Sequence, residues 1–396
     1  MQKLLLSGLM VCVMAMPALA GLKFPDIDVK GNLSLKSIAA DKYLGDTAKT
    51  DCVQLKADLN LSAELADNVG LKAVLRNEST QGAGNNNDLN AVLSQTVVYH
   101  VYLNVKDIAG VDAVIGRQNI GEKKNALVYQ SSRADAIKLS KKCGPVDVTY
   151  VSANGPDNRD TLSAIMAGGK IGPANVSVAN YTRQYAVPSA KSADQVIDLA
   201  VSGKIPVACG IDASLEYAKQ SGGKIGTVKK DATAMLIKLG YSGCDMAVGK
   251  ASCGLTILNT SGNKTSADKD EDYTGIAPSL KLTEIVSDIA AGQKNDDLTY
   301  STAIANRNAI VINLGLAPAA VEGLTLGLAY GTYAFNEDIV NICTKGKYAT
   351  EINLTAGYKV SDAVSMSLLL AQMDPKIIGG NTDKATKIQA GMKIVF

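Results

Sequence analysis

Charged side chains in this sequence recur at every second position of stretches that are otherwise apolar. In residues 53–64, Lys56, Asp58 and Glu64 alternate with leucine and alanine. Because successive side chains of a β-strand point to opposite faces, this spacing gathers the charges on one face. Such a face can attract ions and polar molecules. The same alternation places one set of residues on charged faces: Lys30, Lys36, Lys56, Asp58, Glu64, Lys72, Arg76, His100, Lys138, Arg183, Asp198, Glu216, Lys238, Glu351 and Lys359.

The sequence contains few residues that could form a catalytic or metal-binding site. His100 is the single histidine, and Ser94 lies too near it on the same chain to suggest a Ser/His pair. The acidic run at residues 268–272 offers oxygen ligands for Ca²⁺ but lacks the spacing of a calcium loop, which favours a solvated acidic segment. We therefore predict no enzymatic activity, no cofactor and no metal site.

Composition excludes several classes of protein. The chain has 396 residues, 40 basic and 38 acidic, with a formal net charge of +2, so nothing favours a nucleic-acid partner. Hydrophobic residues make up 46% and charged residues 20%, which argues against disorder. The mean hydropathy of +0.07 is too polar for a multi-helix membrane protein. Glycine is abundant, with 36 residues, whereas phenylalanine occurs 3 times and tryptophan is absent.

The first twenty residues have the three parts of a secretory signal peptide. Lys3 supplies the positive start, an apolar stretch follows, and Ala18-Leu19-Ala20 forms an A-x-A cleavage site. A lipoprotein signal at Cys12 is the alternative, but that cysteine lies inside the apolar stretch. We expect residues 1–20 to be cleaved after export and residues 21–396 to form one domain.

The alternation points to a transmembrane barrel rather than a soluble sandwich. A sandwich core would contain bulky aromatic side chains, whereas the apolar faces here carry Leu, Val, Ile, Ala and Gly. Segments of about ten residues with one apolar and one charged face are typical of outer-membrane β-barrels. We predict an all-β, closed antiparallel barrel of 18 strands, within a range of 16 to 20, at 27–37, 52–65, 69–78, 95–106, 111–118, 134–142, 146–153, 161–170, 174–185, 195–204, 209–219, 232–242, 246–258, 307–316, 324–335, 348–360, 364–373 and 386–396.

The predicted connections alternate between tight turns and long polar loops. The long loops are 38–51, 79–94, 119–133, 186–194, 220–231, 259–306 and 374–385. In outer-membrane barrels the short turns lie on the periplasmic side and the long loops outside, and an even strand count places both termini in the periplasm. Loop 119–133, which carries Glu122, Lys123, Lys124 and Arg133, either enters the barrel and narrows it or is an exposed outer loop. The longest loop, 259–306, could cap or plug the mouth through a short helix at 278–289, or it contains a further strand pair that would raise the count to 20.

Six cysteines follow the signal segment: Cys52, Cys143, Cys209, Cys244, Cys253 and Cys343. They contain no Cys-x-x-Cys motif, so zinc and redox sites have no support. Cys209 and Cys244 fall at the same end of two neighbouring predicted strands, which would be compatible with a disulfide.

The C-terminal strand carries the most specific signal. Ile388, Ala390, Met392, Ile394 and Phe396 share one face, and the chain ends on that phenylalanine. An alternating last strand with a terminal Phe resembles the assembly signal of bacterial outer-membrane proteins, which implies insertion by the barrel-assembly machinery. An ordinary edge strand is the alternative interpretation.

The sequence resembles the large porin families. Residues 113–121, AVIGRQNIG, followed by ADAIKL at 134–139, are similar to a segment of the 18-stranded alginate-export-type porins. The resemblance implies an aqueous pore in the bacterial outer membrane for passive diffusion of small hydrophilic solutes or ions. A structural or adhesive surface protein with a plugged barrel is the alternative. Bases outnumber acids on the charged faces, so we expect a weak preference for anions. Monomer and homotrimer both remain open.

Overall fold

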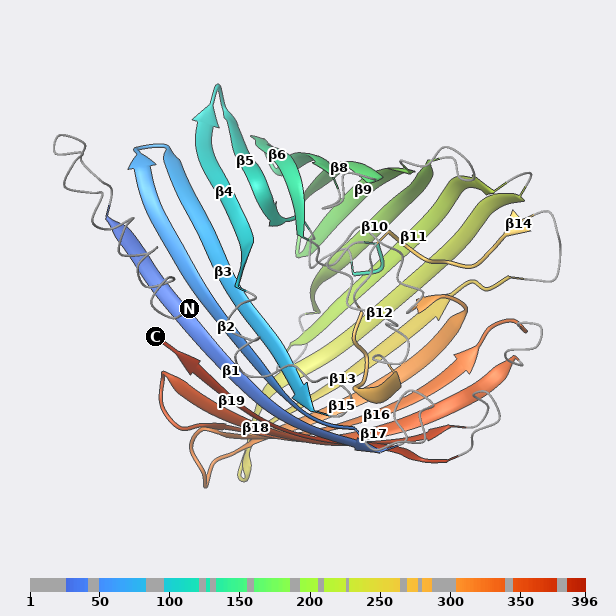
Figure 1. The fold of residues 1–396 in the computed structure, drawn as a ribbon. Helices are drawn as coiled ribbons and strands as arrows, with labels where there is room; N and C mark the ends of the chain where they lie inside the picture. Colours follow the sequence, from blue (N-terminus) through green and yellow to red (C-terminus); the bar gives the residue numbers. More distant parts are fainter. Residues whose placement is uncertain are drawn as a thin grey trace.

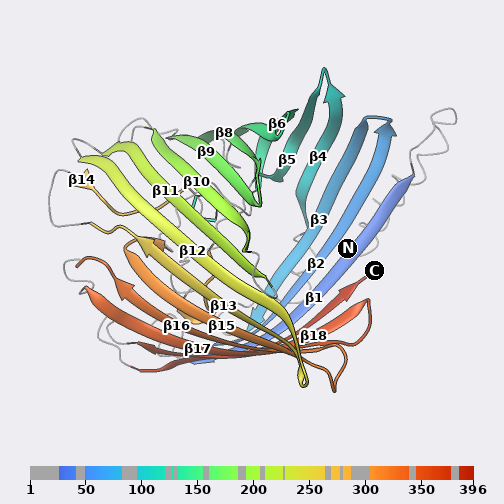
Figure 2. The same ribbon diagram turned by 180° about the vertical axis from the view of Figure 1, so that it is seen from behind.

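The computed structural model describes residues 26–41, 50–82, 96–120, 126–128, 133–154, 160–185, 193–205, 210–225, 228–263, 269–276, 280–286, 304–338, 345–375 and 383–396. These residues form one β-sheet that closes on itself (Figures 1 and 2). Its strands are β1 (Ile27–Asp41), β2 (Thr50–Ala66), β3 (Val69–Gly82), β4 (Val97–Ile108), β5 (Val111–Asn119), β6 (Arg133–Cys143), β7 (Val146–Asn154), β8 (Asp160–Ile171), β9 (Ala174–Tyr185), β10 (Asp194–Ile205), β11 (Ile211–Ile225), β12 (Val228–Met246), β13 (Gly249–Thr260), β14 (Lys269–Asp270), β15 (Arg307–Pro318), β16 (Leu324–Phe335), β17 (Gly346–Lys359), β18 (Val364–Pro375) and β19 (Ala385–Val395).

Eighteen of these strands make a closed antiparallel barrel, as the sequence predicts. β13 pairs directly with β15, and the two-residue β14 only adds a parallel pairing at the end of β12. β1 pairs with β19 over ten residue pairs from Asn32↔Val395 to Asp41↔Thr386, which removes the last free edge. Among the described residues, no helix is long and apolar enough to cross a bilayer.

The outer face of the barrel is aliphatic along mid-strand. Ile165 is 58% exposed, Ile197 51% and Leu354 49%, whereas their neighbours on the opposite face are mostly buried. An apolar surface of this extent around the circumference of a sheet is suited to lipid and unsuited to water. The polar residues of the alternating pattern therefore point into the barrel.

Short turns join the strands at one end. Gly144 and Gly172 begin two-residue turns with φ of 62° and 58°. A glycine adopts this left-handed conformation without strain, and the proline after it cannot continue the ladder. The predicted turn at 243–245 is wrong: β12 continues through a bulge at Ser242/Cys244, and Ala247–Val248 makes the turn.

The predicted loop 220–231 is also mostly wrong. β11 runs on to Ile225 and β12 begins at Val228, so the two strands remain paired well beyond their apolar section. The hydrophobic alternation stops near residue 219, but the backbone hydrogen bonds do not require it.

The C-terminal residue takes part in barrel closure. The Gly31 nitrogen donates to the Phe396 carbonyl at 2.7 Å, and the Phe396 nitrogen donates to the Gly31 carbonyl at 3.0 Å. A Cβ on Gly31 would lie 2.3 Å from Cζ of the Phe396 ring, so the missing side chain makes room for the ring.

Deletion of Phe396 should weaken closure, because it removes both of these hydrogen bonds together with the ring contact. We expect a lower yield of folded, heat-modifiable barrel on gel electrophoresis and faster unfolding in urea. Phe396→Leu keeps the backbone pair and is the matched control. Wild-type yield and unfolding rate after the deletion would contradict this role.

Candidate functional site

All fifteen residues of the predicted charged set lie on the lumen face. Most of them lie between exposed residues of the outer surface, as Glu216 does between Leu215 and Tyr217. Lys138 lies in the same way between Ile137 and Leu139. The structure thus gathers these residues inside one barrel, and their part in permeation remains a prediction.

Arg76 and Asp58 on the lumen face form an ion pair, so their charges cancel. Arg76 Nε lies 2.6 Å from Asp58 Oδ1, and Nη2 lies 3.1 Å from Oδ2, which makes a bidentate ion pair between β2 and β3. The guanidinium carbon also lies 3.4 Å from the centroid of the Tyr99 ring. A bidentate contact stacked on an aromatic ring fixes the arginine in one orientation.

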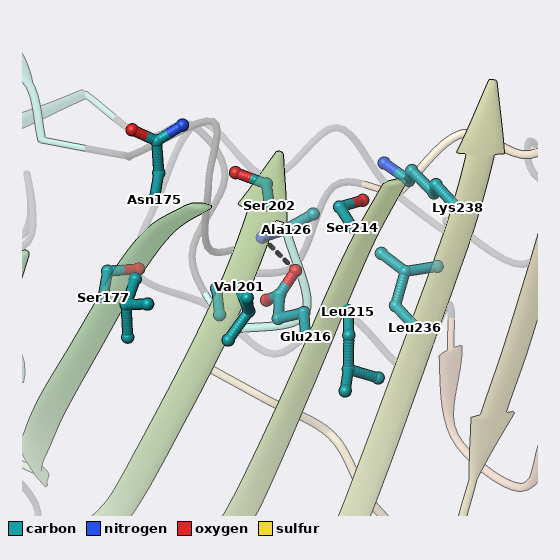
Figure 3. A pocket seen from close by; sticks show the side chains of 12 residues that line it. Ala126, Asn175, Ser177, Val201, Ser202, Ser214, Leu215, Glu216, Leu236 and Lys238 are labelled. Atoms are coloured by element: carbon teal, nitrogen blue, oxygen red, sulfur yellow. Dashed lines mark hydrogen bonds between the residues drawn. The ribbon is translucent and has the colours of Figure 1, made fainter. Parts of the chain in front are cut away.

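A segment of the predicted loop 119–133 enters the barrel and is held by Glu216. The backbone nitrogen of Ala126 donates to the Glu216 carboxylate at 3.0 Å (Figure 3). The backbone nitrogen of Leu127 donates to the same carboxylate at 2.7 Å. Ala126, Leu127 and Val128 are almost fully buried. Since Glu216 projects from the wall strand β11, residues 126–128 lie inside the lumen.

A second segment, residues 269–276, packs against the first. The Tyr273 hydroxyl donates to the Leu127 carbonyl at 3.2 Å, and the Ile276 nitrogen donates to the Val128 carbonyl at 3.1 Å. Burial raises the pKa of the Tyr273 hydroxyl well above its usual value, so the group stays protonated as a donor. Gln220 on β11 accepts from the nitrogens of Thr274 and Gly275 at 3.1 and 3.2 Å.

A third segment, residues 280–286, is held by Glu351 on β17, five strands along the barrel wall from β11. The nitrogens of Glu284, Ile285 and Val286 donate to the Glu351 carboxylate at 2.8, 2.8 and 2.7 Å, and Thr283 Oγ1 donates at 2.7 Å. Lys387 on β19 lies 3.3 Å from Glu284. Only Ile285–Val286 is helical here, so within the described residues the predicted helix at 278–289 is reduced to a fragment.

The inserted segments cover part of the charged set. Arg183 is 3% exposed, Asp198 1%, Glu216 5% and Glu351 1%. These four lie on the lumen face, but the segments separate them from the water path. Both carboxylate oxygens of Asp198 lack a hydrogen-bond partner in the described part of the chain. The cover removes three acids and one base from the lining, which makes the remaining wall more basic.

Sequence reasoning missed a row of lysines near the short turns. Lys142, Lys170 and Lys204 lie on the lumen faces of β6, β8 and β10, and Lys238 on β12 continues the row. Asp147 and Asp212 are the acids beside them. The period-two alternation places these lysines on the charged face, but Lys142, Lys170 and Lys204 are the last residues of the predicted strands, where the alternation is a weak guide.

A cavity of about 240 Å³ lies between this row and residues 126–128. Glu216 and Lys238 line it together with Ser177, Ser202 and Ser214 (Figure 3). Its walls therefore combine one cation with several hydroxyl groups, which can bind polar or anionic molecules. The carboxylate of Glu216 is already occupied by the backbone of residues 126–127.

Arg117 and Asp112 on β5 have opposite parity, so the two side chains belong to different faces of the barrel. The structure places Arg117 on the outer face with Ile115 and Ile137, paired with Asp135 through bonds of 2.9 and 3.0 Å. The β5–β6 register runs without interruption from Asp112 to Asn119, so no bulge turns the arginine inward.

Several predicted residues lie outside the described residues. These are Glu122, Lys123 and Lys124, the side chain of Arg133, Cys209 and the side chain of Cys244. Cys52, Cys143 and Cys253 are free thiols. In the acidic run, Asp270 pairs with Lys230 at 3.0 Å and Asp272 accepts from Asn263 at 2.9 Å. The described residues contain no cluster of three side chains that could hold a metal ion.

Glu351→Gln should loosen residues 280–286, because an amide has one oxygen acceptor where the carboxylate has two, and its NH₂ faces backbone donors. We expect the amides of residues 284–286 to exchange hydrogen about tenfold or more faster, as for the loss of a charged hydrogen bond. Mass spectrometry of the corresponding peptide measures this. Glu64→Gln is the control, because Glu64 lies on the lumen face and contacts no inserted segment among the described residues. Equal exchange in both variants would contradict the anchoring role.

Comparisons with known proteins identify the fold. No family model matches the sequence, and no curated protein matches it. Among solved structures, Pseudomonas aeruginosa OccK5 (OpdH) aligns over 93% of this chain and 98% of its own, with 12% identity and a TM-score of 0.62. Acinetobacter baumannii OccAB2 covers 93% and 98% at 10% identity and 0.62. Pseudomonas aeruginosa OccK2 (OpdF), solved in complex with glucuronate, covers 95% and 99% at 11% identity and 0.61.

These structures are outer-membrane porins with an 18-stranded barrel, and they do not support the narrower resemblance to alginate-export-type porins. At this identity the comparison concerns architecture alone. The chain therefore has the fold of the OccK and Opd porins.

Proposed function

We propose that this chain forms an aqueous channel in the bacterial outer membrane for passive diffusion of small hydrophilic solutes. The observation that carries the proposal is the separation of the two faces: aliphatic side chains outside and a charged, largely basic lining inside a closed barrel. An interior bounded by eighteen strands is wide enough to hold water beside the inserted segments. The shared fold with the OccK and Opd porins supports the same function.

Export and assembly belong to the same proposal. Residues 1–20 would direct secretion and be cleaved, and the last strand with Phe396 would be recognised by the barrel-assembly machinery. The short turns and both termini would then face the periplasm, with the long loops outside. The narrower kinship with alginate-export-type porins and a homotrimeric state rest on the sequence resemblance alone.

We propose anions as the preferred solutes. Asp198, Glu216 and Glu351 are covered, and Asp58 is neutralised by Arg76. Most of the lysines of the lumen face stay accessible, among them Lys36, Lys72 and the row near the turns. A basic wall in a confined space raises the local concentration of anions. OccK2 was solved with glucuronate, a carboxylate of the size that such a lining could admit.

The alternative is a barrel that anchors surface loops and has no open path. The inserted segments narrow the interior of the barrel, and this narrowing is the observation that favours the anchoring function. Reconstitution in planar bilayers separates the two functions, because an anchoring barrel would not produce stepwise conductance.

In such bilayers the purified protein should give discrete conductance steps and a reversal potential on the anion side under a salt gradient. The preference should shrink as salt rises, because the screening length falls from about 10 Å at 0.1 M to about 3 Å at 1 M. Absence of conductance would favour the anchoring barrel. Cation preference at low salt would contradict the assigned lining.

Charge reversal at the lysine row tests the lining directly. Lys170→Glu combined with Lys204→Glu should lower the anion-to-cation permeability ratio by roughly twofold or more, because both side chains lie in the lumen. Lys141→Glu combined with Lys219→Glu carries the same change of charge on the outer face of the barrel and is the control. If both double variants shift the reversal potential equally, the row does not set selectivity.

A further inference from the structure

Along the outer face of β11 and β12, a belt of exposed apolar side chains gives way to polar side chains toward the loops. Leu215, Tyr217 and Met235 are exposed apolar side chains of that belt. The next outward positions toward the loops are polar: Lys219, Ser221, Asp231 and Lys229. Because β11 and β12 remain paired to Gly222↔Lys230 and beyond, these residues are held on a regular sheet that continues out of the belt.

β14 adds a third lysine to this surface. Lys269 is paired with Lys229 in parallel register, at the end of β12 that the figures show far from the short turns (Figures 1 and 2). Lys269 Nζ lies 3.0 Å from Asp231, and Lys219 Nζ lies 3.5 Å from the same carboxylate. Lys230, next in sequence, is buried and turns to Asp270 instead.

A hollow of about 550 Å³ opens among these side chains. Lys219, Ser221, Gly222, Lys229, Asp231 and Lys269 border it. Lys219 and Lys269 thus share the Asp231 carboxylate, and Lys229 lies directly opposite Lys269 on the adjacent strand. Like charges at paired positions destabilise a sheet unless an anion lies between them. The geometry therefore favours an anionic ligand in the hollow.

Its height on the barrel indicates the source of that anion. Lys219 is two residues beyond Tyr217, which corresponds to about 7 Å along a strand. The polar headgroup layer of a bilayer begins at the edge of the hydrocarbon core and is roughly 5–7 Å thick on each side. Lysines at this level on a lipid-facing surface meet headgroups, whereas solutes pass on the other side of the wall.

We propose that Lys219, Lys229 and Lys269 form a binding site for the phosphate of a lipid headgroup in the outer leaflet. Asp231 positions two of the three ammonium groups, and the Ser221 hydroxyl and the Gly222 backbone border the space that the phosphate oxygens would occupy. The proposal rests on the membrane location proposed above, but not on conduction.

Native mass spectrometry of the full-length mature protein tests the site. The protein is released from detergent after incubation with bisphosphorylated lipid A or with its dephosphorylated form, and lipid adducts are counted as collision energy rises. We expect the wild type to retain the phosphorylated lipid. The triple variant K219Q/K229Q/K269Q should retain at least about tenfold less of it, because each basic residue near an anionic lipid surface adds to the affinity.

The control variant K141Q/K250Q/K345Q removes the same charge from other exposed lysines and should behave as wild type. Equal adducts in the two triple variants would overturn the site, as would equal retention of dephosphorylated lipid by the wild type. Inorganic phosphate at millimolar concentration is a third arm: if it displaces the lipid completely, the site is specific for free phosphate and the assignment to a headgroup is wrong.

Heat-modifiable mobility confirms that each variant is folded. Conductance of the same preparations separates this proposal from the channel function: loss of lipid adducts with unchanged conductance supports the site alone. Absent conductance with normal lipid retention would contradict the channel and leave the site in place.

Discussion

The fold depends on one constraint: every backbone N–H and C=O in contact with lipid must find a partner in the sheet. Strands can meet this requirement only if the sheet closes into a barrel, and the pairing of β1 with β19 closes it. Closure then fixes the direction of every side chain, because alternate residues must point to lipid or to the lumen. When charged residues stand at every second position of a strand, as Lys56 and Asp58 do on β2, closure of the barrel places all of them in the interior.

Within that wall, two carboxylates determine how the interior is filled. Glu216 and Glu351 accept the backbone N–H groups of residues 126–127 and 284–286, which would otherwise be buried without partners. A buried carboxylate and a buried stretch of irregular backbone each carry a desolvation cost, and the contact offsets both. The same contacts withdraw negative charge from the water path, so the filling of the barrel and its basic character have a common cause.

The sequence was sufficient for the barrel, its strand number and the parity of the lumen residues, because these follow from a period-two pattern that lipid and water enforce. It could not predict that Glu216 and Glu351 anchor loops rather than face solvent, because a glutamate on the charged face has the same sequence pattern in both cases. It also misplaced the β11–β12 connection, where Lys229 and its neighbours are paired without apolar alternation. Cys209 and Cys244 show the limit of spacing arguments: their positions suggest a pair, but their side chains lie outside the described residues.

The most direct test of this account is the reactivity of two adjacent residues on one strand. In a protein whose own cysteines are replaced by serine, Ser214→Cys would place a thiol in the lumen, and Leu215→Cys would place one on the outer face. A charged, membrane-impermeant thiol reagent added during single-channel recording should reduce the current through the Ser214→Cys channel and leave the Leu215→Cys channel unchanged. Equal effects on both, or block only at position 215, would contradict the assignment of the two faces and with it the channel itself.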